Sequence, residues 1–208
     1  MWNVNVMKRT IAGLALGAVA ITAAGCATTE AAQLDKPHGT KAEKQASGPS
    51  PRANTMYGMC RILRAQGKIE QAEVALTGLM SEFPDFSPTY NDLAEIQLDR
   101  GRLDDAIHYL NEGLKVAPTD PVLQNNAGVC ALLQHDYAVA LEHFQAAAAI
   151  APYEQRYKAN VALATGLNGD TEKSNALYQE VISGDAADYN TEIIKGLLAP
   201  QEIVAPTD

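Results

Sequence analysis

The chain has 208 residues and carries 25 acidic against 16 basic side chains, a formal net charge of −9 at pH 7. This acidic balance excludes nucleic acid as an expected partner, because binding to phosphates requires clustered lysines and arginines. The length permits one domain with a sizeable core, and alanine and leucine rather than aromatic residues dominate the apolar content, which predicts an all-α fold.

Residues 1–25 are typical of a secretory signal peptide. Lys8 and Arg9 precede an apolar run from Thr10 to Ala24 that is too short to span a bilayer core of about 30 Å. The run ends in Ala23-Ala24-Gly25-Cys26, which resembles a bacterial lipobox with alanine at the place where leucine is usual. The resemblance implies cleavage after Gly25 and acylation of Cys26, so the mature protein would be a lipoprotein. An ordinary signal peptide with an incidental cysteine is the alternative.

The residues from Cys26 onward also indicate which membrane the protein is attached to and how it is tethered there. Ala27 rather than aspartate follows the cysteine, and by resemblance to the enterobacterial sorting pattern this favours the outer membrane, on its periplasmic face. Several acyl chains would hold the protein firmly on the membrane without crossing it. Residues 26–52 are expected to form the lipidated cysteine and a disordered tether, because Leu34 is their only large apolar residue among scattered prolines, glycines and charges.

Residues 53–188 divide into four copies of a 34-residue unit, at 53–86, 87–120, 121–154 and 155–188. Places are counted from the first residue of each copy. Place 8 is occupied by Cys60, Ala94, Gly128 and Ala162, and place 15 by Gly67, Gly101, His135 and Gly169. Place 20 is occupied by Ala72, Ala106, Ala140 and Ser174, place 24 by Leu76, Leu110, Phe144 and Tyr178, and place 32 by Pro84, Pro118, Pro152 and Ala186.

This spacing resembles the tetratricopeptide repeat (TPR) family. The resemblance implies two antiparallel helices per copy that cross closely at the small residues, with proline ending the second helix. The fourth copy lacks the proline and is expected to be degenerate, as terminal repeats often are. The expected fold is an all-α helical-hairpin solenoid of about four repeats.

Residues 189–208 are expected to contain a capping helix and a loose tail. Six residues fall at helical spacing before Pro200, which would end the helix: Ala186, Tyr189, Asn190, Ile193, Ile194 and Leu197. The sequence thus predicts that one additional helix covers the last repeat.

Little in the sequence indicates catalysis. After lipidation Cys60 and Cys130 remain. They lie in first helices of two repeats that are separated by a whole repeat, so they would be roughly 15–20 Å apart, too far for a disulfide. The four histidines show no metal-ligand spacing, and no phosphate-binding glycine loop or Ser, His, Asp grouping is evident. We therefore expect no enzyme, no metal and no cofactor.

The expected binding site is the groove of the array. In TPR arrays the first helices line the concave face, and by that resemblance places 2, 5, 6, 9, 12 and 13 point into it. Amides both donate and accept hydrogen bonds, so a row of them could bind the backbone of an extended peptide from a protein partner. The candidate residues are Tyr57, Asn91, Asp92, Asn125, Asn126, Val129, Leu133, Asn160, Leu163 and Leu167. Two alternatives stay open: Asn125 and Asn126 could merely start a helix near Pro121, and the apolar residues could pack between helices.

A narrower resemblance concerns the whole architecture. The lipobox cysteine, the polar tether and about four repeats, with Asn125-Asn126-Ala127-Gly128-Val129 and Asn160-Val161-Ala162-Leu163-Ala164, resemble the TPR lipoprotein of tight-adherence (Tad/Flp) pilus systems. The resemblance implies an accessory that helps a secretin assemble or reach its membrane. Pilotins of type IV pili and lipoprotein adaptors of murein hydrolases share this architecture. An adaptor that recruits murein hydrolases or other cell-envelope proteins is therefore the alternative.

Overall fold

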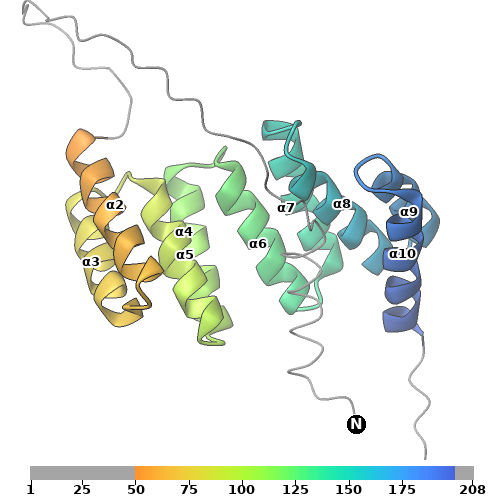
Figure 1. Cartoon of the computed structure of the whole chain (residues 1–208), viewed down its shortest axis with the longest axis horizontal. Coiled ribbons are helices and arrows are strands. Elements are labelled where there is room, and N and C mark those ends of the chain that lie inside the picture. The colour runs from red at the N-terminus through yellow and green to blue at the C-terminus, as the bar shows by residue number, and fades with distance from the viewer. Residues whose placement is uncertain (1–49, 200–208) are drawn as a thin grey trace, which may run out of the picture.

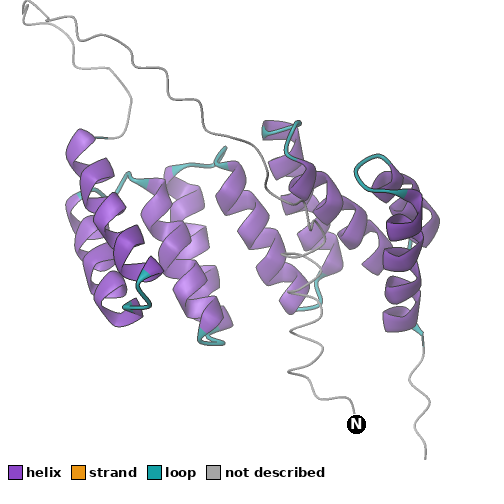
Figure 2. Cartoon of the chain, viewed as in Figure 1, coloured by secondary structure: helices purple, strands orange, loops and turns teal. Residues whose placement is uncertain are grey.

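The computed structural model of the chain describes residues 50–199. In this range the chain forms nine α-helices joined by short turns, without a strand (Figure 2). The helices follow one another in a row from α2 to α10 (Figure 1). The expected signal peptide at 1–25, the lipidation site Cys26, most of the tether and the tail from residue 200 lie outside the described residues.

The helices alternate between two sets. The first helices of the repeats are α2 (Pro51–Ala65), α4 (Ser87–Asp99), α6 (Pro121–Leu133) and α8 (Gln155–Leu167). The second helices are α3 (Ile69–Glu82), α5 (Leu103–Val116), α7 (Tyr137–Ile150) and α9 (Thr171–Gln179), and α10 (Gly184–Leu198) follows. The starts of α4, α6 and α8 reproduce the 34-residue period, so the expected all-α repeat solenoid is confirmed. Proline stands in the first turn of α2, α4 and α6, where its missing N–H leaves no hydrogen bond unmade.

The turn inside each repeat uses a left-handed residue at place 15. Gly67 and Gly101 both have φ of 73° and Gly169 has φ of 106°. His135 has φ of 63° at the same place and is the only non-glycine residue with positive φ between residues 50 and 199. Each repeat therefore reverses direction at an equivalent residue, and three of the four use glycine, which adopts this conformation without steric cost.

The helices of a repeat cross where the sequence places small residues. All four side chains at place 20 are fully buried, and so are the four at place 24: Ala72, Ala106, Ala140, Ser174, Leu76, Leu110, Phe144 and Tyr178. At Gly128, an added Cβ would lie 2.6 Å from a ring carbon of Phe144, closer than real Cβ atoms approach. The place-8 glycine thus permits the close approach of α6 and α7.

The C-terminal end departs from the expected boundaries. The second helix of the fourth repeat, α9, ends at Gln179, and α10 begins at Gly184 rather than at residue 189. The reason is local: Ser183 has extended backbone angles (φ −61°, ψ 152°), so the chain leaves the helical conformation before place 32. The capping helix therefore takes over residues assigned to the fourth repeat. No helix among residues 50–199 combines the length and the apolar character needed to cross a membrane.

Candidate partner-binding face

Five polar side chains of the first helices form a hydrogen-bonded row, which we call the amide ladder: Asn91, Asp92, Asn125, Asn126 and Asn160. Between repeats, the residue at place 6 bonds to place 5 of the preceding repeat. Asn126 Nδ2 donates to Asn91 Oδ1 at 2.6 Å, and Asn160 Nδ2 donates to Asn125 Oδ1 at 2.7 Å. Both bonds join residues 35 positions apart, which is one repeat plus one residue.

Bonds within repeats make the row continuous. Asn125 Nδ2 donates to Asn126 Oδ1 at 3.1 Å, and Asn91 Nδ2 approaches Asp92 Oδ1 at 3.4 Å. The ladder therefore runs without interruption across α8, α6 and α4. Five residues that the sequence places in one groove are brought together, and they bind one another.

The N-terminal end of the ladder is charged. Asn91 Nδ2 also donates to Glu95 Oε1 at 3.0 Å, and Arg64 from α2 bridges Asp92 Oδ1 at 3.0 Å and Glu95 Oε2 at 2.9 Å. Burial, followed by the neighbouring Asp92 carboxylate, raises the pKa of Tyr57, which lies 35 positions before Asp92. Repeats one and two thus interact through places 5 and 6, as the later repeats do. Here place 5 is the phenol of Tyr57 and place 6 is the carboxylate of Asp92.

The carboxylates fix the direction of every amide. A carboxylate only accepts hydrogen bonds, so Asn91 turns its Nδ2 toward Asp92 and Glu95. Its Oδ1 then faces Asn126, which has to donate, and the same constraint passes along the row to Asn125 and Asn160. The amide dipoles therefore align head to tail, which strengthens each bond of the row.

Exposure is greatest at the centre of the ladder. Asn91, Asp92 and Asn160 are 8%, 4% and 3% exposed, whereas Asn125 and Asn126 are partly exposed. A carboxamide has two N–H donors and two acceptor positions, and Asn125 and Asn126 each use one donor and one acceptor inside the ladder. Within residues 50–199, one N–H and one acceptor position of each amide make no further side-chain hydrogen bond.

The apolar half of the expected groove is core. Val129, Leu163 and Leu167 are buried in the cluster formed by the last two repeats and α10, and Leu133 is partly buried against it. These residues therefore pack between helices, as the alternative interpretation of the sequence expected, and do not line an open groove. The physical reason is the closeness of neighbouring repeats, which brings places 9 and 13 of α6 and α8 against adjacent helices.

The asparagines do not start a helix. Asp120 caps α6, and its Oδ1 accepts hydrogen bonds from the backbone N–H groups of Val122 and Leu123. Asn125 and Asn126 therefore lie inside α6, where asparagine has a low helix propensity. Their side-chain hydrogen bonds to α4 and α8 explain their presence there.

Arg64 and Glu95 belong to the site and are absent from the candidate residues obtained from the sequence. Arg64 is at place 12 of one repeat, and Glu95 is at place 9 of the next. The sequence does show opposite charges at these two groove places of adjacent repeats, and this pattern could have indicated the ion pair. The ion pair matters for the ladder because it compensates the charge of the buried Asp92.

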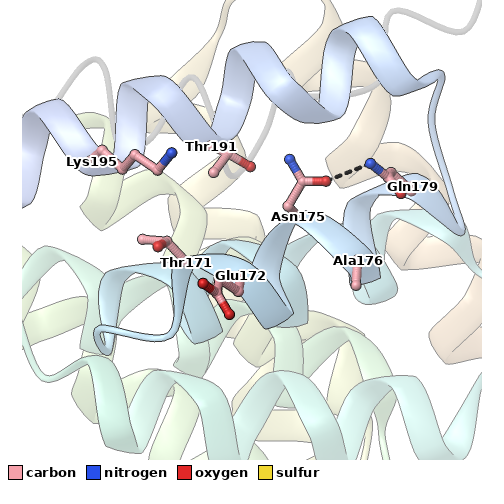
Figure 3. Close-up of a pocket in the computed structure, with 7 residues that line it drawn as sticks. All are labelled: Thr171, Glu172, Asn175, Ala176, Gln179, Thr191 and Lys195. Atoms are coloured by element: carbon pink, nitrogen blue, oxygen red, sulfur yellow. Dashed lines mark hydrogen bonds between the residues drawn. The ribbon is translucent and has the colours of Figure 1, made fainter.

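The other groups considered in the sequence analysis are the cysteines and possible metal ligands. Cys60 and Cys130 are free and buried, and burial raises the pKa of Cys130 to about 12, so its thiol stays protonated at neutral pH. Residues 50–199 contain no group of three or more side chains suited to holding a metal ion. A pocket of about 340 Å³ lies between α9 and α10, lined by Thr171, Asn175, Thr191 and Lys195 among others, and it shares no residue with the amide ladder (Figure 3).

Comparison with known proteins supports the fold. A family model of the tetratricopeptide repeat matches residues 63–125. The chain has no significant match among curated protein sequences.

Three solved structures illustrate the likeness. PilF of Pseudomonas aeruginosa has a TM-score of 0.60 at 14% identity, over 70% of this chain and 68% of that chain. YrrB, a TPR protein described with an unusual peptide-binding site, has a TM-score of 0.59 at 13% identity, over 72% and 79%. MamA from Desulfovibrio magneticus RS-1 has a TM-score of 0.57 at 16% identity, over 74% and 99%. The described residues thus form a TPR-like helical solenoid, a fold consistent with a protein-interaction scaffold.

Proposed function

We propose that the chain is a non-enzymatic scaffold that binds an extended segment of a protein partner along the amide ladder. The observation that carries the proposal is the state of Asn125 and Asn126, which are held in fixed orientation by neighbouring amides and keep a donor and an acceptor each. An extended backbone offers the matching acceptors and donors whatever its sequence. The function requires no cofactor and no nucleic acid.

The ladder lowers the entropic cost of binding. A free asparagine side chain would have to be immobilised by the ligand, whereas these two are already oriented before the ligand arrives. A hydrogen bond contributes about 0.5–1.5 kcal/mol net, so two amides with two bonds each supply roughly 2–6 kcal/mol. Side-chain contacts of the partner would have to supply the remaining affinity.

The proposal extends to the cell envelope on the strength of the sequence. The lipobox-like residues before Cys26 support lipid anchoring at the periplasmic face of the outer membrane. The resemblance to TPR lipoproteins of Tad/Flp pilus systems supports a role in assembling the pilus secretion system or in localising its secretin. YrrB has a similar fold and is described with a peptide-binding site, which is consistent with peptide binding by this chain.

The identity of the partner tests this function. The full chain is purified from detergent-solubilised envelope after mild cross-linking in the cell, and the proteins that accompany it are identified by mass spectrometry. We expect a secretin or another pilus-assembly component to be the main specific partner. A murein hydrolase in that position would establish the adaptor function instead, and the absence of any specific protein would contradict a scaffold.

A further inference from the structure

The two central amides of the ladder hold their oxygen and nitrogen atoms in a fixed order along the array. Asn126 Nδ2 donates to Asn91 on α4, so its nitrogen lies on the side of repeat two. Asn125 Oδ1 accepts from Asn160 on α8, so its oxygen lies on the side of repeat four. The bond from Asn125 Nδ2 to Asn126 Oδ1 joins the other two atoms. From α8 toward α4 the order is therefore oxygen, nitrogen, oxygen, nitrogen.

The charged end of the ladder prevents the opposite order. If every amide were turned round, Asn91 Oδ1 would face the carboxylate oxygens of Asp92 and Glu95, which accept hydrogen bonds and donate none. The next amide of the row would then meet a nitrogen where it needs an acceptor. The direction of the ladder is thus set within the chain, before a partner binds.

An extended backbone also presents its hydrogen-bonding groups with a direction. Along one edge of a strand the N–H and the C=O of the same residue lie side by side, and the next such pair belongs to the residue two positions later. From the N-terminus to the C-terminus, the N–H of each pair comes first. A carboxamide that binds such a pair with its own oxygen and nitrogen therefore determines which way the strand runs.

One direction of the bound chain lets each amide bind one residue. Asn125 Oδ1 then accepts from the N–H of a first residue while Asn125 Nδ2 donates to its C=O, and Asn126 does the same with the residue two positions later. This chain runs from α8 toward α4. In the opposite direction, the N–H and C=O of one residue would have to bridge Asn125 Nδ2 and Asn126 Oδ1, which are already bonded to each other at 3.1 Å.

We infer that the partner's extended segment lies antiparallel to the array, with its N-terminal part over repeat four and its C-terminal part over repeats two and one. The inference rests on the proposed function, because it gives the orientation of the segment that the ladder binds. The two residues bound by Asn125 and Asn126 each need a backbone N–H, so neither is proline. A partner that binds through a C-terminal tail therefore has its folded part on the side of α8 and α10.

Photo-cross-linking from the two ends of the array tests this orientation. The photoreactive residue p-benzoylphenylalanine replaces either Asn54 in α2 or Arg156 in α8, which are exposed and occupy place 2 of repeats one and four. Each full-length variant is irradiated in the cell, and mass spectrometry of the linked peptides identifies the partner residues at each end. Cross-links are scored when they disappear on adding Asn125→Ala with Asn126→Ala. The control site is Asn111, which is exposed on the second helix α5.

We expect both ends to link to one segment, with the site at 156 reaching residues nearer the partner's N-terminus than the site at 54 does. Three steps between first helices span roughly 24–30 Å, so the linked residues should be about eight positions apart in an extended chain. The reverse order, or the same residues linked from both sites, overturns the inference and leaves binding to the ladder intact. If no cross-link depends on Asn125 and Asn126, the proposed function itself fails, and the inference fails with it.

Discussion

At the scale of single residues, His135 occupies a backbone conformation that the other three repeats assign to glycine. Its φ of 63° brings the Cβ close to the following carbonyl oxygen, a contact that glycine avoids. The Nδ1 atom of His135 lies 3.0 Å from the hydroxyl of Tyr137, but this contact is exposed and contributes little.

His135→Gly should therefore raise the free energy of unfolding by about 1 kcal/mol. The measurement is urea denaturation followed by circular dichroism. Gly101→His is the matched reverse change, at a residue with φ of 73°, and should lower stability by a similar amount. A glycine variant less stable than the wild type would show that the His135 side chain contributes more than its backbone costs.

The sequence shows the amides of the site but not their pairing. Places 5 and 6 carry Asn91, Asn125, Asn126 and Asn160, so the row is visible once the period is known. That place 6 bonds to place 5 of the preceding repeat depends on the rotation between neighbouring repeats, which no local pattern specifies. For the same reason the sequence places Asp92 and the asparagines in one groove, and only the structure shows that they form one hydrogen-bonded network.

At the scale of secondary structure, the small residues at place 20 determine how closely the two helices of a repeat approach. Ala140 is fully buried between α7 and its neighbours in the largest core cluster. Interiors of proteins are close-packed, so an added isopropyl group has to displace neighbouring side chains or backbone.

Ala140→Leu should lower the free energy of unfolding by about 1–3 kcal/mol. For a chain of this size that corresponds to a fall of roughly 2–4 °C in the melting midpoint per kcal/mol. Ala138→Leu, at an exposed position of the same helix, makes the same chemical change without overpacking and is the control. Equal midpoints for the two variants would mean that place 20 is not where the helices cross.

Helix boundaries were predictable wherever a residue type forces them. Proline at place 32 follows the ends of α3, α5 and α7, and glycine or histidine at place 15 reverses the chain in every repeat. The boundary between α9 and α10 has no proline, and the break is at Ser183, a residue type that does not force an extended backbone. Because the 34-residue period was extended to residue 188, the expected start of the capping helix, residue 189, is later than its observed start at Gly184.

At the scale of the whole molecule, the amide ladder extends over three successive repeats of the array. It crosses α4, α6 and α8, and Arg64 of α2 contacts its charged end through Asp92. All four repeats therefore contribute a first helix to this network or to its charged end.

The proposed lipid anchor makes a prediction about the whole chain. Cys26→Ser removes the thiol that would be acylated, so the variant should lose incorporation of labelled fatty acid and should leave the membrane fraction or remain uncleaved. Cys60→Ser, which changes a buried cysteine in α2, is the control and should keep the label. Labelling of the Cys26 variant equal to that of the wild type would contradict the lipoprotein proposal.

The most direct test of the central claim measures partner capture by the ladder itself. Envelope proteins are captured by the wild type, by Asn125→Ala with Asn126→Ala, and by Asn111→Ala, which removes an exposed amide from the second helix α5. Circular dichroism of each variant checks that the helical fold persists. If the ladder holds the partner's backbone, the double variant should lose binding about tenfold or more, while Asn111→Ala binds like the wild type. A folded double variant that captures the partner as well as the wild type would contradict the claim.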